Sequence, residues 1–114
     1  MPVIPVSIAS DSMKQEFQRG DLVIVYKIKK ENMNEIEVGE IIQYRTGNIS
    51  VIHRIVEINE DYNGRNLYIT KGDNNEAVDI YPVKEEQIVG IAKFKMPILG
   101  WFALIFKSNA TQNT

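Results

Sequence analysis

The sequence contains no cysteine and a single histidine among its 114 residues. Without cysteine there can be no disulfide bond, no thiolate nucleophile and no cysteine-ligated zinc, so packing alone must hold the fold together. One histidine also argues against a histidine-rich metal site. That histidine, His53, is therefore the only candidate imidazole base in the chain.

The chain also lacks an excess of positive charge and a long apolar run. Its 13 Lys and Arg against 15 Asp and Glu leave a net charge of −2, which gives no electrostatic reason to expect nucleic acid as a partner. No segment reaches the roughly 18 to 20 consecutive apolar residues of a membrane-spanning helix, so we expect a soluble chain. The apolar start at 2–9 has no basic region before it and is not a signal peptide.

Length and composition predict one small domain. With 44% apolar residues, the chain can bury a real but small core. We expect a single β-rich domain over residues 1–107 and a disordered polar tail over 108–114. Two interpretations stay open for the most hydrophobic run, 97–106: a final core strand or helix, or a surface that contacts lipid through Trp101 and Phe102.

Short β-branched runs separated by turns dominate the rest of the chain. Strands are predicted at 22–26, 41–44, 49–58 and 67–70, each preceded by a turn that contains glycine. Helical turns are predicted near Ser12 and at 31–36 and 84–87. The pattern indicates a mainly β protein, a small closed or sandwiched antiparallel β fold with few short helices and sequential strand pairing.

Ser12 lies where an apolar segment gives way to a predicted helical turn. With Gln15 it fits a capping box, in which serine only satisfies free backbone amides. The start of a helix is also a good place for a nucleophile, because free N–H groups can stabilise an oxyanion there. The two interpretations are compatible.

His53 and a later acidic loop supply the other groups that nucleophilic catalysis requires. Alternation along the predicted strand places half-buried His53 on one face with Val51 and Ile55, and Arg54 on the opposite face. A neutral imidazole serves as a base when it lies near a hydroxyl and a carboxylate orients it. Asp73 and Asp79 follow the next strand, and either could orient His53; a structural histidine and an ordinary turn are the alternatives.

Several motifs in this order resemble signal peptidase I of the archaeal and endoplasmic-reticulum type, from about Val6 to Gly100. They are Ser-Asp-Ser-Met at 10–13, Arg-Gly-Asp at 19–21, Gly-Glu-Ile-Ile at 39–42, Val-Ile-His-Arg at 51–54, and Lys-Gly-Asp-Asn-Asn at 71–75 with Asp79 six residues after Asp73. Each motif alone is weak, but the ordered set is specific. The chain departs from the family at Gln15, where proline is usual and would fix φ.

The resemblance implies the roles of the site residues. Ser12 matches the nucleophile, and His53 stands where the bacterial branch has a lysine base. Asp79 is favoured as the carboxylate that supports His53, and Asp73 is kept as a site residue. Ser10 and Met13 are expected on the oxyanion and substrate side. The family uses no metal or cofactor.

The resemblance also implies the function. It predicts a serine endopeptidase that removes signal peptides after small residues at the extracytoplasmic or reticulum-lumen side of a membrane. The family usually enters the serine motif from a transmembrane helix, so we expect a catalytic fragment or an anchor outside the sequence given. Three alternatives stay open: a repressor-type autoprotease, which uses a lysine base; a non-catalytic β module that binds extended peptides; and a scaffold subunit of a larger complex.

Overall fold

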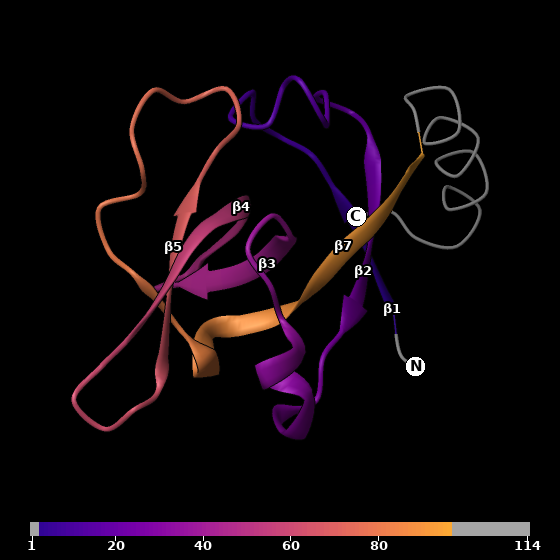
Figure 1. Cartoon of the computed structure of the whole chain (residues 1–114). Coiled ribbons are helices and arrows are strands. Elements are labelled where there is room, and N and C mark those ends of the chain that lie inside the picture. Colours follow the sequence, from indigo (N-terminus) through magenta and orange to yellow (C-terminus); the bar gives the residue numbers. More distant parts are fainter. Residues whose placement is uncertain (1–2, 97–114) are drawn as a thin grey trace.

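The computed structural model describes residues 3–96, and its seven strands form one antiparallel sheet in the order β1-β2-β7-β3-β4-β5-β6 (Figure 1). The strands are β1 (Val3–Ser7), β2 (Leu22–Lys27), β3 (Ile41–Thr46), β4 (Ile49–Glu60), β5 (Asn66–Lys71), β6 (Val83–Lys84) and β7 (Ile88–Met96). Two short 3₁₀ helices, η1 (Lys30–Glu35) and η2 (Glu85–Gln87), complete the elements. The predicted fold class, mainly antiparallel β with few short helices, is confirmed.

The four predicted strands correspond to β2, β3, β4 and β5. The apolar, β-branched residues of β2 explain its place inside the sheet, since Val23 and Val25 are completely buried. Sequential pairing holds for β1 with β2 and along β3 to β6. It is wrong between β2 and β3, because the unpredicted strand β7 lies between them and pairs with both.

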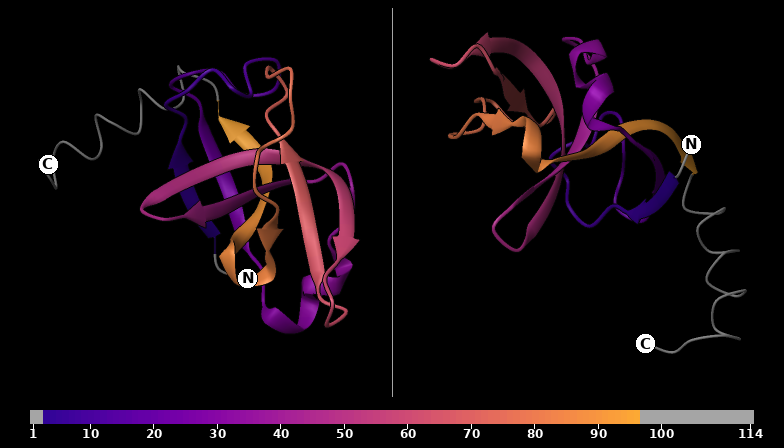
Figure 2. Two further views of the ribbon diagram at one scale, coloured as in Figure 1. Left: turned by 90° about the vertical axis from the view of Figure 1, so that its left-hand side faces the viewer. Right: turned by 90° about the horizontal axis from the view of Figure 1, so that it is seen from below.

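The sheet is strongly twisted, and Figure 2 shows β1 and β2 at one end of it and β5 at the other. Two apolar clusters form the core. The larger consists of Met33, Ile36, Ile42, Tyr44, Ile55, Tyr68, Val83 and Ile88. The smaller consists of Met13, Phe17, Val23, Val25 and Ile41. The smaller cluster holds the serine segment, because two residues of that segment, Met13 and Phe17, belong to it.

The segment around Ser12 forms a helical turn, as predicted, but this turn does not continue into a helix. Hydrogen bonds run from the Lys14 N–H to the Asp11 carbonyl and from the Phe17 N–H to the Met13 carbonyl, and no helix follows. A capping box and a helix dipole therefore do not explain this serine. Within residues 3–96, no helix has the length and apolar character that crossing a membrane requires.

The predicted end of the domain at residue 107, the polar tail 108–114 and the apolar run 97–106 with Trp101 and Phe102 lie outside the described residues. The predictions made for them stay predictions.

Candidate active site

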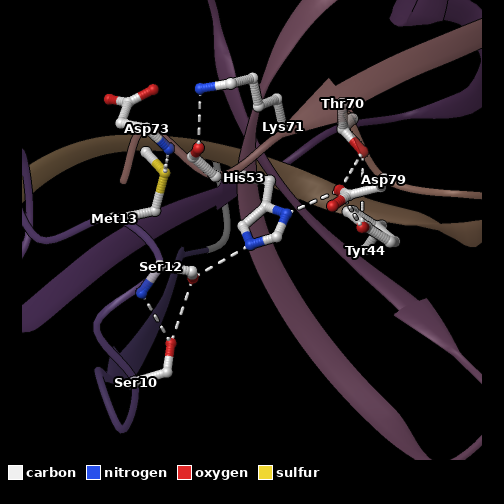
Figure 3. A network of polar contacts seen from close by, with 10 residues as sticks. Ser10, Ser12, Met13, Tyr44, His53, Thr70, Lys71, Asp73 and Asp79 are labelled. Atoms are coloured by element: carbon white, nitrogen blue, oxygen red, sulfur yellow. Dashed lines mark hydrogen bonds and ion pairs between the residues drawn. The ribbon is translucent and has the colours of Figure 1, made fainter. Parts of the chain in front are cut away.

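Three side chains from distant parts of the chain converge at one site (Figure 3). Ser12 comes from the turn after β1, His53 from β4 and Asp79 from the loop between β5 and β6. The Ser12 Oγ lies 3.0 Å from the His53 Nε2. The His53 Nδ1 lies 2.6 Å from the Asp79 Oδ2. The three groups therefore form a continuous chain of hydrogen bonds from a hydroxyl to a carboxylate.

Strand alternation brings His53 to this site. Val51 and Ile55 pack with the larger apolar cluster, and Ile52 packs with the smaller one, as the period-two pattern predicts. His53 is only 8% exposed, so it is more deeply buried than the half-buried position expected. Hydrogen bonds at both ring nitrogens fix the orientation of the buried ring.

The hydrogen-bond partners determine which ring nitrogen carries the proton. An ionised carboxylate can only accept, so the His53 Nδ1–H donates to the Asp79 Oδ2. In the neutral imidazole the Nε2 is then the acceptor, and it faces the Ser12 hydroxyl. The arrangement is that of a general base poised to remove the serine proton.

Asp79 is held by two further donors that sequence reasoning missed. The Thr70 Oγ1 donates to the Asp79 Oδ2 at 2.6 Å, and the Tyr44 hydroxyl donates to the same oxygen at 3.0 Å. Burial raises the pKa of the Asp79 carboxyl, but the hydrogen bonds from Thr70, His53 and Tyr44 outweigh burial and hold that pKa below its usual range. Asp79 is therefore ionised at neutral pH.

Ser10 lies next to the Ser12 hydroxyl on the side away from His53. The Ser10 Oγ is 3.1 Å from the Ser12 Oγ and 3.5 Å from the Ser12 backbone nitrogen. Because the Ser12 proton points to His53, the Ser10 hydroxyl is the donor to the Ser12 Oγ. The Ser12 N–H donates to the Ser10 Oγ, so these two groups lie together beside the Ser12 hydroxyl.

The Asp73 carboxylate forms its hydrogen bonds with Arg54 and not with His53. The ion pair with Arg54 is bidentate, with contacts of 2.9 Å from the Nε and 2.8 Å from the Nη2. These bonds hold the pKa of the Asp73 carboxyl below its usual range. Arg54 also donates to the Gly39 carbonyl and pairs with Glu16. Asp73 therefore helps to join the segments around the site, and Asp79 is the aspartate that orients His53.

The loop that carries Asp73 also makes backbone contacts with the serine turn. The Asn74 N–H donates to the Ser12 carbonyl at 2.7 Å, and the Asp73 N–H contacts the Met13 Sδ at 3.1 Å. Met13 was expected on the oxyanion or substrate side, but its side chain is 2% exposed and belongs to the core. Its side chain therefore anchors the turn and does not face a substrate.

Gly72 allows this loop to approach the site closely. A Cβ at this position would lie 2.7 Å from the Ser12 carbonyl oxygen and 3.0 Å from the His53 Nε2. Sequence reasoning quoted Gly72 within its motif but gave it no role. Thr70 and Tyr44 stand in ordinary strand patterns, and no local signal marks them.

A groove of about 330 Å³ runs past the Ser12 hydroxyl. It is lined by the segment 6–10 with Ser12, and by the first half of β4, residues 49–53, which includes His53. Among residues 3–96, no group of three or more His, Asp and Glu side chains is arranged to hold a metal ion. The arrangement can perform acyl transfer by its own side chains.

Comparison with known proteins identifies relatives, although no family model matches the chain. Signal peptidase complex catalytic subunit SEC11 of Eremothecium gossypii is 36% identical over 114 aligned residues, which cover 91% of this chain and 66% of the relative. SEC11 of Lachancea thermotolerans is 35% identical, with the same two shares. SEC11C of Homo sapiens is 33% identical, and the alignment covers 88% of this chain and 55% of the relative.

The chain spans about two thirds of the length of the fungal relatives and about half of the human one. The match extends over nearly all of this chain. The chain belongs to the signal peptidase I family, of the archaeal and endoplasmic-reticulum type.

Proposed function

We propose that this chain is the catalytic part of a serine endopeptidase that removes signal peptides from secreted proteins at a membrane surface, cleaving after small residues. The observation that carries the proposal is the hydrogen-bonded chain from Ser12 through His53 to Asp79, in a member of a family whose relatives are named as catalytic subunits.

Catalysis begins with the attack of Ser12 on the scissile carbonyl. The His53 Nε2 takes the proton of the Ser12 hydroxyl as the Oγ–C bond forms, and Asp79 stabilises the resulting imidazolium. The carbonyl oxygen becomes an oxyanion, with the Ser12 N–H and the Ser10 hydroxyl as its donors. The C–N bond then breaks, the imidazolium gives its proton to the leaving amine, and an acyl-enzyme is left on Ser12.

Hydrolysis of the acyl-enzyme repeats these steps with water as the nucleophile. His53 takes a proton from water, and the hydroxyl attacks the ester carbonyl. Collapse of the second tetrahedral intermediate breaks the bond to the Ser12 Oγ, which recovers its proton from the imidazolium. The carboxylate product leaves and the resting state returns.

The groove beside Ser12 suits an extended peptide. β1 is an edge strand of the sheet, and its continuation forms one wall. β5 pairs with β4 only from Arg54 onward, so the stretch 49–53 is bonded to β3 on one side and lines the groove on the other. An extended substrate can add backbone hydrogen bonds to such edges, and a shallow groove accepts small side chains beside the cleaved bond.

We place this catalytic part at the extracytoplasmic or reticulum-lumen surface of a membrane, where signal peptides emerge. Trp101 and Phe102 are proposed to contact the bilayer surface, since aromatic and aliphatic side chains bury well at that boundary. Flotation with lipid vesicles tests this part of the proposal. Wild type should float with the vesicles and the double variant Trp101→Ser/Phe102→Ser should not; equal behaviour of the two would reject membrane contact through these residues.

Cleavage of a short Ala-x-Ala peptide by wild type and by Ser12→Ala tests the enzymatic proposal, with Ser108→Ala as a matched control. Wild type and Ser108→Ala should cleave at equal rates, and mass spectrometry after an acid quench should find an acyl adduct on Ser12. Ser12→Ala should keep the melting temperature and lose cleavage. Cleavage at the wild-type rate by Ser12→Ala would reject the assignment. A wild type with neither cleavage nor adduct would favour the non-catalytic peptide-binding module.

A further inference from the structure

Asp79 lies on a loop and not on a strand, although the proposed mechanism needs it in one place. β5 ends at Lys71 and β6 begins at Val83. The neighbours of Asp79 on the loop, Val78 and Ile80, are 49% and 86% exposed. A carboxylate on such a segment orients an imidazole well only if other groups hold it, because a misplaced catalytic group costs much of the rate.

Thr70 holds Asp79 at two points. Its Oγ1 donates to the Asp79 Oδ2 at 2.6 Å, and its carbonyl accepts from the Asp79 N–H at 2.8 Å. Thr70 itself is completely buried and pairs with Ile55 in the neighbouring strand β4. The same residue therefore ties both the backbone and the side chain of the loop aspartate to strand β5.

Tyr44 supplies a second hydroxyl from a different strand, β3. Its hydroxyl donates to the Asp79 Oδ2 at 3.0 Å, and its ring is part of the larger apolar cluster. Burial, together with the negative charge of Asp79, raises the pKa of the Tyr44 phenol to about 12. The phenol therefore keeps its proton, and remains a donor, at any working pH.

We infer that Thr70 and Tyr44 are positioning residues, whose hydroxyls hold the Asp79 Oδ2 in line with the His53 Nδ1 and so keep the His53 Nε2 directed at Ser12. Figure 3 shows both hydroxyls and the His53 ring directed at the Asp79 carboxylate. The inference rests on the proposed function and deepens it. Neither residue lines the substrate groove, so their loss should lower kcat and leave KM nearly unchanged.

Steady-state kinetics of Thr70→Val, Thr70→Ser and Tyr44→Phe with the Ala-x-Ala peptide test the inference. Valine keeps the shape of threonine and removes the donor, whereas serine keeps the donor. Hydrogen bonds to charged groups are strong enough that we expect kcat to fall by about 10- to 100-fold in Thr70→Val and about 10-fold in Tyr44→Phe. The kcat of Thr70→Ser should stay within about threefold of the wild-type value. The KM of all three variants should stay within about twofold of the wild-type value.

A double-mutant cycle separates positioning from a general structural role. Once Asp79 is replaced by alanine there is no carboxylate to position, so Thr70→Val in the Asp79→Ala background should lower the residual kcat by less than about twofold. An undiminished loss in that background, or wild-type kcat in both Thr70→Val and Tyr44→Phe, would overturn the inference. Circular dichroism shows whether each variant folds. If Thr70→Val does not fold, Tyr44→Phe is used in its place in the same cycle with Asp79→Ala.

Failure of this inference is distinguishable from failure of the proposed function. An inactive wild type or an active Ser12→Ala would remove the proposed function. If wild type cleaves, Ser12→Ala does not, and the hydroxyl variants keep their kcat, the proposed function stands and the positioning role falls.

Discussion

The substitution Asp79→Asn isolates the charge of the proposed triad from its geometry. Three donors converge on the Asp79 Oδ2: the His53 Nδ1–H, the Thr70 hydroxyl and the Tyr44 hydroxyl. If the asparagine placed its NH₂ group at the position of the Oδ2, that donor would meet three other donors and form no hydrogen bond with them. Its carbonyl oxygen should therefore occupy the position of the Oδ2, and the imidazole should keep the tautomer that accepts from Ser12.

The expected loss of kcat in Asp79→Asn follows from the lost negative charge alone. In well-studied serine proteases the corresponding change costs about 10⁴ in kcat, because the imidazole takes the wrong tautomer. Here the two hydroxyls should preserve the tautomer, so only the attraction between carboxylate and imidazolium is lost. Two unit charges about 4 Å apart interact by about 4 kcal/mol at an effective dielectric constant of about 20. Because 1.36 kcal/mol is tenfold in rate, we expect kcat to fall by about 10³.

The assay is cleavage of the Ala-x-Ala peptide, with kcat and KM determined separately for wild type, Asp79→Asn and Asp79→Ala. KM should change little in both variants. Asp79→Ala should lose more than Asp79→Asn and should melt at a lower temperature, because Thr70 and Tyr44 would each keep a buried hydroxyl without this acceptor. A kcat for Asp79→Asn within tenfold of wild type, or equal losses in the two variants, would refute the reasoning.

Two further predictions concern the loop that holds the serine turn. Gly72→Ala should lower kcat at least tenfold and destabilise the fold by about 1 to 3 kcal/mol, because the new Cβ would lie 2.7 Å from the Ser12 carbonyl oxygen. Steady-state kinetics and chemical unfolding measure these two effects. An unchanged kcat would contradict the prediction. Asp73 has a pKa below its ordinary value of 3.8 in the fold, so its pair with Arg54 stabilises the protein above about pH 4, and that stability is lost as the pH falls through the folded pKa. Asp73→Asn should thus melt below wild type at about pH 7 and approach it at about pH 3; a difference independent of pH would exclude this role.

Much of the candidate site could be predicted because its residues stand in local patterns. The alternation along β4 placed His53 with Val51 and Ile55 and opposite Ile52, as the packing of the two clusters confirms. Glycine-containing turns located the starts of β2 and β3, where Gly20 and Gly39 have positive φ. These features depend on neighbours a few residues apart, so the sequence alone is enough to reveal them.

The central position of β7 could not be predicted in the same way. β7 pairs with β2 and β3, and both partners lie far from it along the chain. Pairing of this kind depends on long-range contacts and leaves little trace in any one segment. β1 was also missed, since Pro5 interrupts its pattern and proline is expected only in edge strands, the position that β1 occupies.

By itself the sequence determined which chemical groups this protein has: one imidazole, a serine in a distinctive motif and two aspartates on one loop. Only the tertiary structure decided which aspartate serves His53. Arg54 points to the opposite face of β4 and binds Asp73, whereas Thr70 and Tyr44 draw Asp79 to the face of the imidazole. The choice depends on which buried donors lie within hydrogen-bond reach of each carboxylate, and only the assembled sheet brings those donors together.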